Sequence, residues 1–214
     1  MLIIDEEQKL GVKQKEKLKY LKKSLNVLSL SATPIPRTLF MSLSGIRDIS
    51  SIISPPTGRK EIETVVTSYN EEVIRETIEN ELNRQGQIYY LHNEVQSIEG
   101  AKNKVSKMFP EAKIEVAHGQ LDEWALAERM KKFAAGEIDI LVCSTIIENG
   151  LDLPDANTLI VEEADRFGLS QLYQIRGRIG RSRRQAHALF TYAKKKISDN
   201  AFKRLKALTE NTEL

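Results

Sequence analysis

An arginine-rich stretch, QIRGRIGRSRR at residues 174–184, contains the densest group of side chains in the chain that could bind an anion. Arginine carries a planar fork of N–H donors that matches the oxygens of a phosphate group. If residues 169–182 are mainly helical, Gln174, Arg178 and Arg181 lie on one face of the helix, because residues three and four apart are neighbours. Such a face suits the stabilisation of negative charge on a phosphoryl group during its transfer, where one arginine is worth roughly a thousandfold in rate or more.

Two glycines interrupt this stretch, and each would cost a helix about 1 kcal/mol relative to alanine. Gly177 and Gly180 are therefore better explained if another backbone must approach closely. The alternative is a salt-bridged surface or a plain DNA-backbone patch. Arg183 and Arg184 fit that alternative, whereas the arginines between the glycines fit it poorly.

A run of acidic residues, Asp5-Glu6-Glu7-Gln8, follows the apolar segment LII. In open α/β sheets, functional groups collect at the carboxyl ends of the strands. One carboxylate there can hold a magnesium ion and the next can position or deprotonate a water. The alternative is an acid-rich helix N-terminus, which the helix dipole favours.

Two further segments place hydroxyl groups at strand ends. Ser31 and Thr33 follow an apolar run and precede a proline, a pattern that also suits helix capping. In CSTIIENGLDLPDANTLIVEEAD, Thr145 ends a strand, Gly150 breaks the next turn, and Asp152 could hold a ribose hydroxyl or orient an arginine. A loop built from Asn-Gly and Leu-Pro turns explains the glycine and the proline, but not three acidic residues in one loop: Glu148, Asp152 and Asp155.

Short apolar runs alternate with amphipathic segments along the chain, which predicts a doubly wound α/β fold with a parallel sheet covered by helices on both faces. We expect strands at residues 2–5, 26–31, 63–67, 87–92, 113–117, 139–145, 157–163 and 186–192. We expect helices at residues 12–23, 36–43, 71–85, 96–108, 121–135, 169–178 and 195–210.

The segment SPPTGRKE at residues 54–61 reads as a linker because it combines two prolines with a glycine. Residues 62–193 hold six expected strands, enough for a complete domain, and residues 194–214 form a helical extension. Residues 1–53 hold only two, so they are expected to be part of a domain. Strands with unpaired edges seek partners, which predicts packing of this part on the rest of the chain or on a second copy.

Composition narrows the class of protein. Hydrophobic residues make up 41% of the 214 residues and the net charge is +2, so any binding of nucleic acid must come from a local patch. Lysine-rich residues 9–23 and 194–206 could supply one, although a solvated helix face is the favoured interpretation of each taken alone. No apolar run approaches the roughly 20 residues that span a bilayer, so no membrane partner is expected. The single cysteine, Cys143, fits a buried strand and a reducing cytoplasm, and no zinc-ligand spacing occurs.

These motifs, in this order, resemble those of superfamily 2 helicases, the two-lobed RecA-like motors. DEEQ is similar to the Walker B box, SATPIPRTL to the coupling motif of the first lobe, and STIIENGLDLP and QIRGRIGR to the last two motifs of the second lobe. Longer stretches, such as IIENGLDLPDANTLIVEEADRFGLSQLYQIRGRIGRS, resemble the bacterial transcription-repair coupling factors most closely. The RecG-type fork-regression helicases are the near alternative, although they usually carry DEQH at the first box.

The resemblance implies a RecA-like second lobe preceded by a partial first lobe, with ATP and magnesium as cofactors. Asp5 would ligate magnesium, Glu6 would activate water, and Arg178 and Arg181 would stabilise the transferring phosphoryl group. The residues implied to contact or sense the nucleotide are Gln8, Gly150, Asp152 and Gln174. The residues implied to meet DNA, or to couple it to the nucleotide, are Ser31, Thr33, His92, Asn93, His118, Gly119, Gln120 and Thr145.

The resemblance also implies double-stranded DNA as a partner, and RNA polymerase and excision-repair proteins as partners of other domains. No GxxxxGK[ST] phosphate loop precedes DEEQ in this sequence, so we expect these residues alone to lack hydrolytic activity. A non-catalytic module that binds nucleic acid through the basic stretch is the alternative for the isolated chain. Taken alone, His92 and His118 are also explained as hydrogen-bonded loop residues.

Overall fold

The computed structural model describes residues 1–5, 10–21, 25–31, 48, 50, 52, 60–144, 156–180, 184–193 and 197–210. The chain divides into two compact units, Met1–Ile53 and Ser54–Leu214. The predicted helix at 36–43 and most of the predicted linker lie outside the described residues. Each unit is treated separately below.

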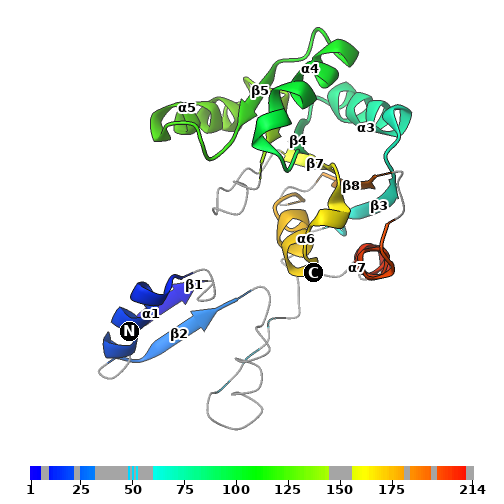
Figure 1. The fold of residues 1–214 in the computed structure, drawn as a ribbon. Helices are drawn as coiled ribbons and strands as arrows, with labels where there is room; N and C mark the ends of the chain where they lie inside the picture. Colours follow the sequence, from blue (N-terminus) through cyan, green and yellow to red (C-terminus); the bar gives the residue numbers. More distant parts are fainter. Residues whose placement is uncertain are drawn as a thin grey trace. The chain divides into compact units, whose positions relative to one another are not determined.

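The smaller unit is a β-α-β element (Figure 1). Strand β1 (Leu2–Asp5) and strand β2 (Val27–Leu30) are parallel and are connected through helix α1 (Val12–Leu21). The predicted strands at 2–5 and 26–31 are therefore confirmed to within one residue. Ile4 is buried, but several apolar residues of these strands remain largely exposed: Ile3, Leu28 and Leu30.

The larger unit is built on a six-stranded sheet in the order β3-β8-β7-β4-β6-β5, and all its strand pairs are parallel. The six strands are β3 (Glu63–Ser68), β4 (Gln87–Leu91), β5 (Ile114–Ala117), β6 (Ile140–Cys143), β7 (Ala156–Val161) and β8 (His187–Tyr192). Strands β4, β6 and β7 are buried along their whole length, as expected for a sheet covered on both faces. The predicted parallel sheet is confirmed.

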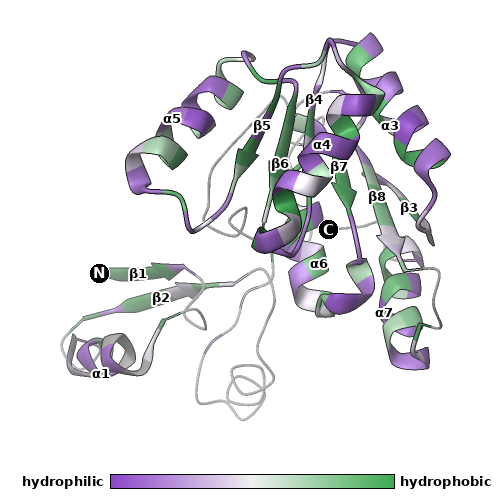
Figure 2. Cartoon of the chain, turned by 45° about the horizontal axis from the view of Figure 1, so that its top comes forward, coloured by the Kyte–Doolittle hydropathy of each residue, from purple (hydrophilic) through white to green (hydrophobic). Residues whose placement is uncertain are grey.

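Helices cover both faces of this sheet, so the doubly wound RecA-like fold is confirmed (Figure 2). Within the described residues, five helices surround the sheet: α3 (Glu71–Asn83), α4 (Ile98–Met108), α5 (Glu123–Ala134), α6 (Leu169–Arg176) and α7 (Asp199–Glu210). Helices α3 and α4 pack on one core, with Ile78 and Val105 fully buried. Helices α5, α6 and α7 pack on the other core, which contains Phe133, Leu172 and Leu208.

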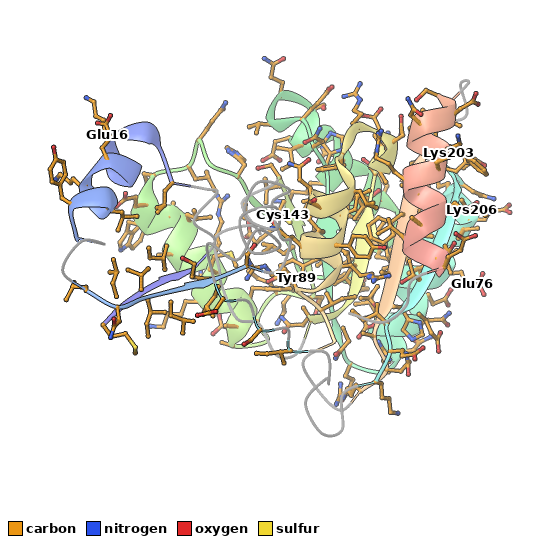
Figure 3. All side chains as sticks on the ribbon, turned by 90° about the horizontal axis from the view of Figure 1, so that it is seen from below. Glu16, Glu76, Tyr89, Cys143, Lys203 and Lys206 are labelled. Carbon is orange, nitrogen blue, oxygen red and sulfur yellow. The ribbon has the colours of Figure 1, made fainter. Side chains whose placement is uncertain are left out.

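Two short 3-10 turns, η2 (Val95–Ser97) and η4 (Ala164–Arg166), complete the described elements, and both follow carboxyl ends of strands. Among the described helices, none is long and apolar enough to cross a lipid bilayer. Cys143 is buried in β6, as predicted, and burial raises the pKa of its thiol. Figure 3 shows Tyr89 and Cys143 within the sheet, whereas Lys203 and Lys206 lie on the outer side of α7.

The predicted helix at 169–178 is confirmed to within two residues, but the helical face that would carry Gln174 and Arg178 together does not continue past Arg176. Helix α6 ends at Arg176, and Gly177 is its C-cap. Gly180 has a φ of +73°, a left-handed conformation that favours glycine. A Cβ there would lie 3.1 Å from the Cβ of Ala186 and 3.2 Å from Ile62 Cγ1. The glycine therefore serves a left-handed turn packed against Ile62 and Ala186, and costs no helix stability.

Candidate functional site

The carboxyl edge of the large sheet collects five of the predicted DNA-contacting residues. His92 and Asn93 follow β4, and His118 follows β5, with strand β6 between them. Gly119 and Gln120 are exposed in the turn after β5. Two sequence segments that are separated by a whole helix thus meet at one edge, where parallel sheets carry functional groups.

A chain of hydrogen bonds fixes His92 at this edge. Its Nδ1 donates to Glu162 Oε2 at 2.5 Å, and its Nε2 lies 2.8 Å from Ser97 Oγ. The Tyr90 hydroxyl donates to the other Glu162 oxygen at 2.6 Å. Both ring nitrogens of His92 are therefore occupied within the protein, and its side chain is only 16% exposed. These contacts fit the alternative for His92, that of a hydrogen-bonded loop residue.

Glu162, at the end of β7, is the centre of this chain and is almost completely buried. Burial acts to raise the pKa of its carboxyl, but hydrogen bonds from His92 and Tyr90 and the charges of His92 and Lys104 outweigh it, so the pKa is lowered. For Tyr90, burial first and the Glu162 carboxylate second raise the pKa well above its ordinary value. The carboxylate is thus held ionised inside the protein by its donors.

The lowered pKa of Glu162 gives a pH dependence of stability. A carboxyl whose pKa is lower in the folded state stabilises the fold above its ordinary pKa of 4.5, and this contribution is lost as the pH falls through the folded value. We expect Glu162→Gln to reduce the free energy of unfolding most at pH 7, and the gap from the parent chain to shrink below pH 4.5. Urea unfolding at pH 7 and at lower pH measures both gaps. A gap that stays constant across this range contradicts the assignment.

A second, exposed group of charges borders the same edge. Arg166 in η4 pairs with Glu94 after β4 and with Glu163 at 3.0 Å. All three side chains are 40–53% exposed, so these pairs contribute little stability in water. Glu163 itself has a φ of +49°, which is uncommon for a residue other than glycine. These pairs link the turn after β7 to the loop after β4.

His118 differs from His92 in its environment. Its backbone oxygen accepts a hydrogen bond from Leu121 N at 3.1 Å, which closes the turn that presents Gly119 and Gln120. Its Nδ1 is buried, and no group within the described parts of the chain hydrogen-bonds to it. This turn therefore carries an exposed glycine and an exposed amide beside a histidine with unused bonding capacity.

The end of α6 and the described turn after it lie at the amino ends of the strands. Gln174 is on α6 and Arg178 is in the turn that follows it, and both side chains are half-buried. Gly180, two residues later, packs on Ile62 and Ala186, which directly precede β3 and β8. The structure thus separates the predicted nucleotide-contacting residues of α6 from the predicted DNA-contacting residues at the carboxyl edge.

The side chain of Arg176 points into the protein. It is completely buried, its Nη1 donates to the Leu208 carbonyl of α7 at 2.8 Å, and its guanidinium lies 4.9 Å from the centre of the Tyr173 ring. The Tyr173 hydroxyl donates to the neighbouring Ala207 carbonyl at 3.1 Å. Both side chains thus satisfy carbonyl groups in the last turn of α7, which a helix leaves without internal partners.

In the smaller unit, Asp5 ends β1 and Ser31 follows β2. The register pairs Asp5 with Leu30, so Ser31, the next residue, lies at the same end of the two strands as Asp5. Both are exposed. Several predicted site residues lie outside the described residues: Glu6, Gln8, Thr33, Thr145, Gly150, Asp152 and Arg181.

A single exposed carboxylate such as Asp5 fits magnesium, because this ion keeps several waters and uses one or two protein carboxylates together with substrate phosphates. Within the described residues, no group of three or more His, Cys, Asp or Glu side chains could enclose a metal ion. Arg178 fits a phosphate group through its guanidinium. Taken separately, Asp5 in the smaller unit thus suits a hydrated magnesium ion and Arg178 in the larger unit suits a phosphate group.

Sequence reasoning missed the roles of Glu162, Glu94 and Arg166. Two consecutive glutamates end the apolar run NTLIVEE, and this is the same signal that singled out the acidic run after β1. The partner of Glu162 lies 70 residues earlier in the chain, at His92. The acidic pair was therefore detectable from the sequence, but its partner was not.

Comparison with known proteins agrees with the fold of the larger unit. Residues 69–183 match the helicase conserved C-terminal domain. The whole chain is 54% identical to a transcription-repair-coupling factor of Staphylococcus epidermidis and 53% identical to that of Bacillus subtilis, and covers 18% of each. The solved structure of RecG bound to a three-way DNA junction superposes on 98% of the chain with a TM-score of 0.74 and 33% identity, over 28% of its own length. The chain therefore belongs to the family of proteins that contain the helicase conserved C-terminal domain.

Proposed function

We propose that a protein carrying this chain is an ATP-driven translocase on double-stranded DNA that displaces stalled RNA polymerase and couples transcription to repair. The observation that carries the proposal is 54% identity along the entire chain to a transcription-repair-coupling factor. The chain spans about a fifth of such relatives, so the activity belongs to the longer protein. These relatives are bacterial proteins, and we place the activity in the bacterial cytoplasm.

Three of the described residues, Asp5, Gln174 and Arg178, have roles at the nucleotide in this proposal. The larger unit is the second RecA-like lobe, and the smaller unit belongs to the first. Asp5 contributes a carboxylate for magnesium, which supplies charge neutralisation on the phosphates when ATP is bound. Arg178 and Gln174 meet the phosphates from the second lobe, and Arg181 acts with them. Arg178 becomes most useful as charge develops on the transferring group, because the backbone of its turn is held in place beforehand by the buried Ile179.

DNA is proposed to contact the carboxyl edge of the large sheet. The exposed Gly119 and Gln120 and the half-buried Asn93 offer backbone and amide donors for the phosphate backbone, which is where most protein–DNA hydrogen bonds form. His92, with both nitrogens occupied, orients this loop and does not need to touch DNA itself.

The exposed apolar residues of the smaller unit support its assignment as part of a lobe. Ile3, Leu28 and Leu30 are each more than two-fifths exposed on a two-stranded sheet, which is marginal by itself. We propose that other strands of the first lobe, or a second copy of the chain, cover them.

Fork regression of the RecG type is the second candidate, and the RecG structure bound to a three-way DNA junction favours it. One experiment separates the two. The longer protein is given ATP with either RNA polymerase stalled on a linear duplex or a synthetic three-way junction. We expect polymerase release to need ATP and to exceed junction processing. Efficient junction processing without polymerase release would instead assign the chain to the second candidate.

A further inference from the structure

We propose that Arg84 is a positioning residue that holds the arginine stretch in place from the opposite side of the sheet. The inference rests on the proposed role of Arg178 in ATP hydrolysis. Arg84 lies at the C-cap of α3, about a hundred residues from the arginine stretch in sequence.

The guanidinium of Arg84 joins two parts of the fold. Its Nη1 donates to the Gln185 carbonyl at 2.7 Å, and its Nη2 pairs with Glu81 Oε2. Glu81 is only 1% exposed, and the Thr158 hydroxyl of β7 donates to the same oxygen. One guanidinium nitrogen of Arg84 thus pairs with a buried carboxylate, and the other donates a hydrogen bond to the backbone of Gln185, just after the arginine stretch.

The backbone around Gln185 is held at further points. The Gln185 side chain donates to the Glu61 carbonyl at 2.7 Å, and Glu63 N donates to the Ala186 carbonyl at 3.0 Å. Arg184 Nη1 lies 3.4 Å from the Arg84 carbonyl. The segment that leads from the arginine stretch into β8 is therefore fixed to α3 and to the start of β3.

The other side of the arginine stretch is fixed to the same place. Ile179 is completely buried, and Gly180 packs on Ile62 and Ala186 in its left-handed conformation. Arg178 lies immediately before these residues. Arg84 binds the backbone of Gln185, and Gly180 packs on the next residue, Ala186. A shift of residues 185–186 would therefore displace the turn that carries Arg178.

A small displacement of a group that acts at a transition state is costly, since a misplacement of about 1 Å can reduce a rate a hundredfold. Arg84 does not touch the nucleotide in this proposal. Its loss is expected to lower kcat for DNA-stimulated ATP hydrolysis about tenfold, while KM for ATP stays within about twofold, because an interaction made only in the transition state is weakened.

The test is a double-mutant cycle in the longer protein, with single-turnover ATP hydrolysis on duplex DNA as the readout. The variants are Arg84→Ala, Arg178→Ala and the two combined, with Arg75→Ala on the exposed face of α3 as the matched control. If Arg84 acts through Arg178, the combined variant hydrolyses ATP no more slowly than Arg178→Ala alone. Arg75→Ala should match the parent protein.

Removal of Arg84 also leaves Glu81 as a buried charge without its cation, which could unfold the protein. The cycle is therefore repeated with Glu81→Gln present throughout, which removes that charge. The proposal is overturned if Arg84→Ala leaves kcat unchanged, if its effect is as large without Arg178 as with it, or if Glu81→Gln restores full activity to Arg84→Ala. If Arg178→Ala itself turns over normally, the proposed function fails as well, so the two failures are distinguishable.

Discussion

Replacement of Arg178 by alanine is expected to lower DNA-stimulated ATP hydrolysis by about a thousandfold in a protein carrying this chain, equivalent to about 4 kcal/mol of transition-state stabilisation. Arg178 lies in a turn, and the residue after it, Ile179, is completely buried. The backbone that carries the guanidinium is therefore held in place before the nucleotide binds. A preorganised cation stabilises developing charge without the cost of reorganisation.

ATP affinity should change far less than turnover, because the charge that Arg178 meets develops mainly in the transition state. Equilibrium binding of a fluorescent ATP analogue and steady-state hydrolysis measure the two quantities on the same preparation. Arg75→Ala, at an exposed position of α3, controls for the loss of a surface cation. Turnover within a few-fold of the parent protein would contradict the assignment of Arg178.

The largest expected loss of stability follows replacement of Phe190 by alanine, at about 3–5 kcal/mol. Phe190 lies in β8, is completely buried, and belongs to the core that joins the sheet to α6 and α7. Its removal leaves a cavity that the surrounding strands cannot close, since β8 is paired on both sides. A loss of this size approaches the whole stability of many domains.

Phe202 on α7 is the matched control, because the same substitution there removes a side chain that is 49% exposed. Urea unfolding of the chain, followed by circular dichroism, gives both free energies of unfolding. Phe202→Ala is expected to cost less than about 1 kcal/mol, as surface substitutions usually do. Equal losses for the two variants would show that the core has been placed wrongly.

The fold was predictable because its determinants are local. Apolar runs such as DILVCST are buried strands, and β6 spans Ile140–Cys143 within the predicted 139–145. The N-caps of α3 and α5 are Asn70 and Asp122, whose side chains accept backbone hydrogen bonds near the start of each helix. Periodicity and turn chemistry were therefore enough to place the elements of the sheet.

The arrangement of the site was less predictable, because its contacts join residues far apart in the chain. Gly180 looked like a weakness in a helix, but its left-handed conformation is set by packing against Ile62 and Ala186. Arg176 was not singled out from the sequence, and one of its partners is the Leu208 carbonyl, 32 residues later. A single sequence does not reveal such partners, because nothing in the local pattern distinguishes a buried arginine from an exposed one.

Movement along duplex DNA is the property that the proposed function requires above all others. Displacement of a fluorescent third strand from a DNA triplex measures it directly, because the third strand is released only when a motor travels along the duplex beneath it. The protein that carries this chain should release the third strand with ATP, fail to do so with a non-hydrolysable analogue, and fail with ATP when Arg178 is replaced by alanine. Hydrolysis of ATP without release of the third strand, or release that the analogue supports equally well, would contradict the account.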